Sequence, residues 1–141
     1  MMVTIEEVEY VLSRTLLPPP KHVFISDKPV RVEERGEGFW VMGFQRRGSD
    51  MIVLTPYSTP ENIVHETIHA MGFGEIAAQI GGKLISLRIQ LLPNLFRRSV
   101  KYRQAGEKPP EALGLEEAGR YYLLREGGEK FQIKHFVLEA V

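Results

Sequence analysis

The sequence predicts an α+β fold in which helices and a small, mostly antiparallel sheet share one hydrophobic core. Two parts of the chain have apolar residues at helical spacing, and short alternating segments bounded by turn residues lie between and after them. A length of 141 residues is sufficient for one domain and too short for two comfortable ones. We therefore expect a single domain over residues 1–141, made of a helix plus small sheet (1–57), a pair of helices (58–105) and a C-terminal extension (106–141).

The first expected element is a helix from Thr4 to about Leu16. Thr4 and Glu7 have the spacing of a capping box, in which the threonine hydroxyl accepts a hydrogen bond from the backbone three residues later. The apolar residues that follow recur on one helical face, and the three prolines at 18–20 end the helix.

Short strands are expected next, at residues 22–26 and 30–34, around an Asp-Lys-Pro turn. Residues 39–46 and 51–55 are typical of a hairpin with a polar loop between its strands. A last alternating segment, at residues 131–138, predicts a C-terminal strand. Together these segments supply the predicted sheet.

A strong helix start follows at residues 58–61, where cap hydroxyls precede a proline and an acid. This helix is expected to end at the Gly72-Phe73-Gly74 turn. A second helix is expected over residues 75–92, and a further helical stretch after Pro93 is expected to reach about residue 104.

Composition excludes several classes of site. The chain has no cysteine, so any metal must be held by His, Asp or Glu. Three glutamates lie within the first nine residues and no positive region precedes an apolar stretch, so we expect no secretory signal. The most apolar later stretch contains Lys83 and Arg88, so we expect no membrane span and a cytoplasmic location.

The segment His65-Glu66-Thr67-Ile68-His69 is an HExxH motif, and it carries the chemical prediction. Residues four apart share one helical face, so both imidazoles can reach one metal ion. Neutral imidazole is a good ligand for Zn²⁺. Glu66 can lie beside a water at the metal without being a ligand, and it can take the proton of that water as general base.

A catalytic zinc site needs three protein ligands and one open position. After His69 the next acid is Glu75, just past the glycine turn, and the one after that is Glu107. Glu75 is therefore the expected third ligand. Its alternative role is to complement the helix dipole at the start of the second helix, without any contact to a metal.

The segment from His65 to Glu75 resembles the active-site segment of zincin metallopeptidases. Its HExxHxxGxxE spacing is similar to the metzincin signature, but no methionine follows Met71, so the Met-turn of that clan is missing. Glu75-Ile76-Ala77-Ala78 resembles the ExxA pattern of the gluzincins, whose third ligand is a glutamate on a following helix. The short distance from His69 and the single small domain resemble the archaeal minigluzincins.

This resemblance, strongest over residues 51–80, implies a zincin-like fold with a backing helix, a small sheet, an active-site helix and a glutamate helix. It implies a hydrolase that cleaves peptide bonds in a protein or peptide substrate, with one Zn²⁺ on His65, His69 and Glu75 and with Glu66 as catalytic base. Proteins of this kind tend to be latent, because a terminal segment or a second subunit covers the cleft. A homodimer is therefore among the states that the resemblance implies.

A different interpretation starts from charge. Residues 115–138 fit a helix followed by a hairpin, as in a winged-helix domain, and the stretch 83–103 is basic. These features suit a nucleic-acid-binding module with a structural zinc, although a charge run of this kind is usually a solvated helix face. A non-catalytic zinc-binding protein is a third alternative, and Glu66 discriminates because only a hydrolase needs it. No acid lies between residues 76 and 106, and the six cations there are Lys83, Arg88, Arg97, Arg98, Lys101 and Arg103.

Overall fold

The computed structural model describes residues 3–26, 30–34, 37–41, 43–44, 50–106 and 135–141. In this part of the chain the helices are α1 (Ile5–Ser13), α2 (Pro60–Ala70) and α3 (Glu75–Leu91). The strands are β1 (His22–Ser26), β2 (Val30–Glu34), β3 (Glu37–Val41), β4 (Gly43–Phe44), β5 (Met51–Leu54), β6 (Tyr102–Gly106) and β7 (His135–Ala140).

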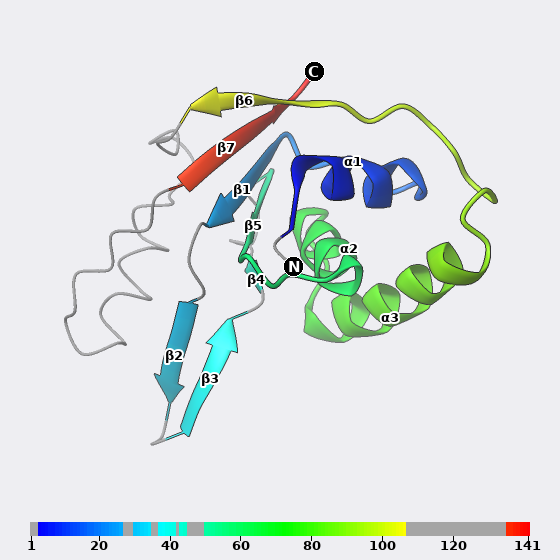
Figure 1. Ribbon diagram of the computed structural model, residues 1–141. Helices are drawn as coiled ribbons and strands as arrows, with labels where there is room; N and C mark the ends of the chain where they lie inside the picture. The colour runs from blue at the N-terminus through cyan, green and yellow to red at the C-terminus, as the bar shows by residue number, and fades with distance from the viewer. Residues whose placement is uncertain (1–2, 27–29, 35–36, 42, 45–49, 107–134) are drawn as a thin grey trace.

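The described strands form two sheets (Figure 1). The larger sheet is mixed and has the order β4-β5-β1-β7-β6, and β2 pairs with β3 in a separate antiparallel ribbon. In the larger sheet β1 and β5 are parallel, while the other three neighbouring pairs are antiparallel. The structure therefore confirms the α+β class and a small, mostly antiparallel sheet.

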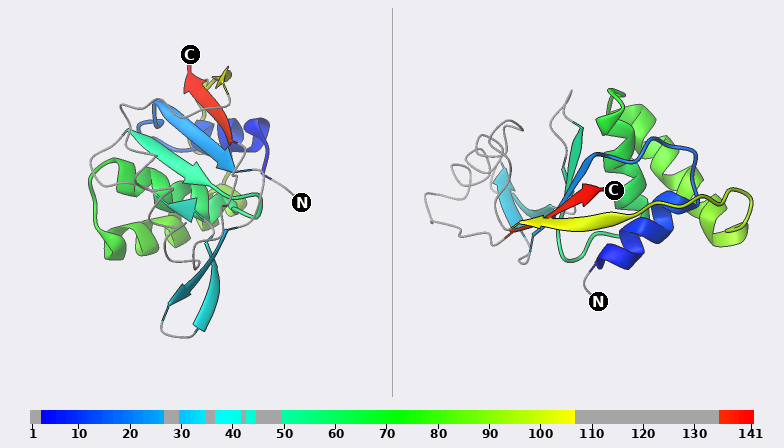
Figure 2. Two further views of the ribbon diagram at one scale, coloured as in Figure 1. Left: turned by 90° about the vertical axis from the view of Figure 1, so that its left-hand side faces the viewer. Right: turned by 90° about the horizontal axis from the view of Figure 1, so that it is seen from above.

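All three helices lie on one side of the larger sheet, as both views in Figure 2 show. Alternate residues of the central strands face them, because side chains alternate between the two faces of a sheet. Val23 lies opposite Ile52 in the parallel register, and Ile25 lies opposite Leu54. The core cluster joins these four residues to buried side chains of the helices, chiefly Val8, Val11, Leu12, Ile63, Val64 and Ile68.

The predicted cap of the first helix is present. The Thr4 hydroxyl accepts a 3.1 Å hydrogen bond from the backbone N–H of Glu7. The helix ends at Ser13, earlier than the expected Leu16, and the Thr15 hydroxyl donates to the carbonyl of Leu12 within the last turn. The Thr15 hydroxyl thus binds one of the last carbonyls, which have no partner within the helix.

The prediction of a further helix between Pro93 and residue 104 is wrong. After α3 ends at Leu91 the chain turns at residues 93–96 and then continues into β6, which pairs with β7. The backbone N–H of Tyr102 donates to the Glu9 carboxylate of α1 at 2.9 Å. Bonds to residues far away in sequence therefore outweigh the local helical preference of this stretch.

The strand pairing also differs from the prediction. Residues 22–26 and 30–34 are strands, as expected, but they belong to different sheets. The expected hairpin is divided, because 37–41 pair with β2 and only 43–44 pair with β5. The C-terminal strand is confirmed as β7, whereas most of the segment proposed as a wing lies outside the described residues.

Of the helices in the described part of the chain, none has the length and apolar character needed to cross a bilayer.

The end of α1 should depend on Arg98. The Arg98 guanidinium donates to the carbonyl oxygens of Leu12 and Leu17, and its backbone N–H donates to Ser13. Arg98→Ala should lower the free energy of unfolding by about 1–3 kcal/mol, because these carbonyls lose a charged donor. Urea titration measures the change. Arg97→Ala, an exposed neighbour, should change stability by less than about 0.5 kcal/mol. Equal stability of the two variants would contradict this role.

Candidate metal centre

The helix that carries the HExxH motif begins with a reciprocal cap. The Thr59 hydroxyl accepts from the backbone N–H of Asn62 at 3.3 Å, and the Asn62 side chain accepts from the backbone N–H of Thr59 at 2.8 Å. Pro60 occupies the first turn, where its missing N–H costs no hydrogen bond. One face of α2 is fixed in the core by Ile63, Val64, Thr67 and Ile68, so both motif histidines lie on a more open face.

The turn after α2 brings the chain back to the histidines. Gly72 has a φ of +95°, a left-handed conformation that favours glycine. Gly74 then begins α3, and Glu75 is the first helical residue. Figure 1 shows α3 returning along α2, and the two helices are in contact. The reversal places the carboxylate of Glu75 beside the imidazoles of α2.

The three residues predicted as metal ligands meet at one point. The Nε2 atom of His69 lies 2.8 Å from Glu75 Oε2, and that of His65 lies 3.2 Å from Glu75 Oε1. All three ligand atoms are within 4.8 Å of one another, and the two rings meet edge to face with centroids 4.8 Å apart. Two imidazole nitrogens and a carboxylate that converge in this way could hold a metal ion.

The tautomer of His69 supports this assignment. Its Nδ1 lies 3.0 Å from the backbone carbonyl of Phe73, which can only accept a hydrogen bond. Nδ1 therefore carries the proton, and Nε2 of the neutral ring presents a lone pair to the cluster. Because the Glu75 oxygen is also an acceptor, the 2.8 Å approach requires either a proton between the two atoms or a cation that both atoms bind. A metal ion meets this requirement.

Glu66 is buried next to the cluster, with only 6% of its surface exposed. Its Oε1 lies 4.0 Å from His65 Nε2, and its Oε2 is buried with no hydrogen-bond partner among the described residues. Burial and then the charge of Glu75 raise the pKa of Glu66 to about 8. Burying a carboxyl without a hydrogen-bond partner destabilises the folded state. Its position next to two imidazoles therefore indicates a functional role.

Burial lowers the pKa of His65, whereas it raises that of Glu66. Desolvation lowers the pKa of His65 and outweighs the carboxylate of Glu75, which raises it. The favoured form of His65 is therefore the neutral imidazole, which is the form that binds metals.

Gly82 is a site residue that the sequence analysis missed. A Cβ atom there would lie 3.3 Å from both the backbone oxygen of Glu61 and the Cβ of His65. The missing side chain lets α3 pass close to the backbone that carries the first histidine. The signal in the sequence is the Gly81-Gly82 pair, because two glycines inside a helix each cost about 1 kcal/mol and indicate close packing.

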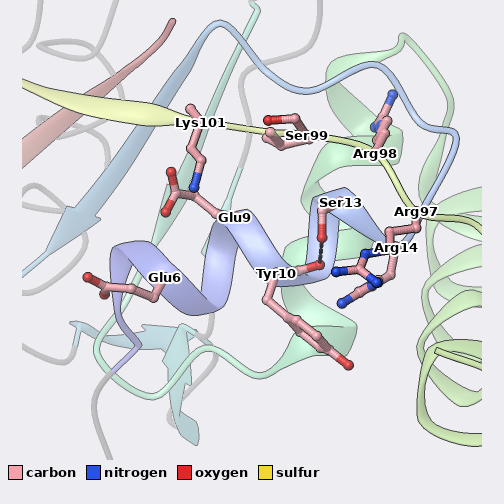
Figure 3. Close-up of a pocket in the computed structure, with 10 residues that line it drawn as sticks. Glu6, Glu9, Tyr10, Ser13, Arg14, Arg97, Arg98, Ser99 and Lys101 are labelled. Atoms are coloured by element: carbon pink, nitrogen blue, oxygen red, sulfur yellow. Dashed lines mark hydrogen bonds between the residues drawn. The ribbon is translucent and has the colours of Figure 1, made fainter. Parts of the chain in front are cut away.

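Several residues of the basic stretch 83–103 bind other parts of the protein. Arg88 donates to the carbonyl of Arg14, Arg98 holds the end of α1, and Arg103 pairs with Glu139 at 3.1 Å. A hollow of about 340 Å³ lies between α1 and residues 97–101, and Figure 3 shows that arginines and glutamates both line it. These residues therefore do not form a uniform cationic surface for nucleic acid.

No protein-family model matches the chain, and comparisons with curated proteins and solved structures find no significantly similar protein. The case for a metal centre therefore depends on the residues and their geometry.

In the metal-free protein, Glu66 should make stability fall as pH rises. The unfolded group ionises near pH 4.5, whereas the folded group keeps its proton until about pH 8. Between these values the folded state binds more protons, so the free energy of unfolding decreases with rising pH. Glu66→Gln cannot titrate, so its stability relative to wild type should increase across this window by roughly 2–5 kcal/mol.

Urea unfolding of both proteins in the presence of a chelator, at several pH values, measures this difference. A difference between the two proteins that stays constant from acidic to alkaline pH would show that Glu66 titrates normally.

Proposed function

We propose that this protein is a zinc-dependent metallopeptidase. The observation that carries the proposal is the buried, unpartnered oxygen of Glu66 beside the cluster of His65, His69 and Glu75. A structural metal site needs only ligands. A buried carboxyl that is adjacent to the ligands and free to accept a proton is the additional group that hydrolysis requires.

His65, His69 and Glu75 would hold the Zn²⁺ and leave one position open, as in other catalytic sites with three protein ligands. A bound Zn²⁺ would supply Lewis acidity, which polarises a peptide carbonyl and makes an attacking water more acidic. The Phe73 carbonyl keeps the proton of His69 on Nδ1 and thus keeps Nε2 directed into the site.

Glu66 would take the proton of the attacking water and deliver it to the leaving amine. Its Oε2 has no partner among the described residues, so the atom is available for this proton. Burial makes the Glu66 carboxylate a stronger base than an exposed glutamate, and a bound Zn²⁺ would counter part of this effect. Burial also fixes the side chain, which keeps the base in one position relative to the ligands.

The sheet supports a peptide as substrate. Within the described sheet β4 is an edge strand, and it is in contact with α2. An extended peptide can pair with such an edge through its backbone, which would place a peptide bond near the helix of the motif. The resemblance of the motif to zincins supports the same class of substrate.

Metal content tests the ligand set. The purified protein should bind about one Zn²⁺ per chain, as expected for a single three-ligand site. His69→Ala should lose the ion and Glu75→Ala should bind it at least tenfold more weakly, while Glu61→Gln on the same helix should bind normally. Elemental analysis and chelator competition measure these effects.

Full zinc retention by His69→Ala would overturn the site. Unchanged affinity in Glu75→Ala would instead assign Glu75 to helix capping.

Peptide hydrolysis tests the role of Glu66. Glu66→Gln should keep zinc and the fold but hydrolyse peptides about 10²–10⁴-fold more slowly, because the amide cannot take a proton. Cleavage of a peptide library by zinc-loaded protein, followed by mass spectrometry, measures the rates, with Glu61→Gln as the control. Activity is measured on the whole chain, because truncation at either terminus would disturb the fold: α1 contributes to the core and β7 lies between β1 and β6.

If folded, zinc-loaded protein cleaves no peptide, or if Glu66→Gln cleaves as fast as wild type, the protein is a non-catalytic zinc-binding protein.

A further inference from the structure

Helix α3 is apolar on two opposite sides. Ala78, Gly82 and Ile89 are buried against the rest of the protein. The opposite side carries the outer stripe, a row of large apolar side chains within an arc of about 80°, given 3.6 residues per turn. The members of the outer stripe are 50–76% exposed, and they are Ile76, Ile80, Leu84, Leu87 and Leu91.

A surface helix normally presents polar residues on its outer side. The outer stripe is instead extended at both ends by exposed apolar residues, which are Met71, Phe73, Leu92 and Leu95. Together these nine side chains offer an area on the order of the roughly 800 Å² that one partner contributes to a stable interface. An apolar surface of this size indicates a binding partner.

The spacing of the stripe fits a second copy of the chain. In an antiparallel pair of α3 helices, Ile76 would lie opposite Leu91 of the other copy, and Ile80 would lie opposite Leu87. Both pairs have the same midpoint, between residues 83 and 84, so Leu84 would lie next to the two-fold axis, close to its own copy and across from Lys83 of the other chain. A symmetric dimer requires this kind of self-complementary surface.

The charges beside the stripe favour a protein partner over a membrane. A helix that lies on an anionic bilayer carries Lys and Arg on its polar side. The exposed polar residues of α3 after its first turn are Gln79, Lys83 and Gln90, of which one is charged. The side opposite the stripe is packed against α2 and offers no polar face to water.

We propose that the outer stripe pairs with its own copy and makes the protein an antiparallel α3–α3 homodimer. This arrangement has a consequence for the candidate metal centre. Ile76 follows Glu75 directly, so Leu91 of the other copy would pack beside the start of α3. The end of the partner's α3 would then border the turn at residues 71–74, next to His69. The dimer would therefore form part of the rim of the site, whether or not the site is catalytic.

The mass of the full-length protein in solution tests the proposal. Light scattering should give twice the chain mass of 16.1 kDa at micromolar concentration. Leu84→Lys should weaken the dimer by more than about 100-fold, because two ammonium groups would be buried at the axis next to Lys83 of both copies, without a carboxylate to pair with. Leu84 is 63% exposed, so the monomer should still fold, which circular dichroism checks. Gln79→Lys introduces the same charge on the same helix outside the stripe and should stay dimeric.

Cysteine cross-linking tests the orientation, since the chain has no cysteine of its own. Leu84→Cys should form a disulfide dimer under mild oxidation. Ile76→Cys should not, because the two copies of residue 76 would be about 22 Å apart along the antiparallel helices.

A monomeric wild type, including one that binds anionic phosphatidylglycerol vesicles as a monomer, would overturn the proposal. Equal cross-linking at both positions would also overturn it, because it would indicate parallel helices. Loss of peptidase activity or of zinc would leave these outcomes unaffected, so the dimer and the proposed function fail independently.

Discussion

The candidate site depends on the close packing of α2 against α3. Gly82 removes the side chain that would separate the helices, and Gly72 lets the chain reverse within a short turn. With the two helices in contact, the first carboxylate of α3 reaches the second ring of the motif at 2.8 Å. A larger residue at either glycine would change the distance between these groups. The geometry of the cluster is thus a result of backbone packing as much as of its ligands.

The cluster itself is electrostatically incomplete. Two carboxyl groups and two imidazoles lie together, and desolvation shifts Glu66 and His65 toward their neutral forms. Both nitrogens of the His69 ring face acceptors, the Phe73 carbonyl and the Glu75 carboxylate, so the two contacts together require a second proton on the ring or a cation that Nε2 and Glu75 both bind. A metal ion bound by His65, His69 and Glu75 would place a positive charge next to the buried carboxyl of Glu66. Binding of the ion should therefore be coupled to the stability of the fold.

The two ends of the described chain complete the domain around this pair of helices. Helix α1 supplies part of the core, and β7 joins β1 to β6 in the larger sheet. Arg98 and Glu9 link α1 to the extended segment that leads to β6. Several residues that could have formed a separate binding surface therefore have structural partners.

Local patterns in the sequence were sufficient for the HExxH motif, the caps at Thr4 and Thr59, and the start of the glutamate helix, because these features depend on residues a few positions apart. They also identified Glu75 as a candidate, but only the turn at Gly72 and the helix contact at Gly82 decided that it meets the histidines. The pairing of β6 with β7 and the division of the expected hairpin depended on residues far apart in the chain. Local preference could not predict those pairings, since hydrogen bonds and burial between distant segments outweigh it. The outer stripe of α3 is likewise visible only in the folded chain, where packing decides which of its two apolar sides faces water.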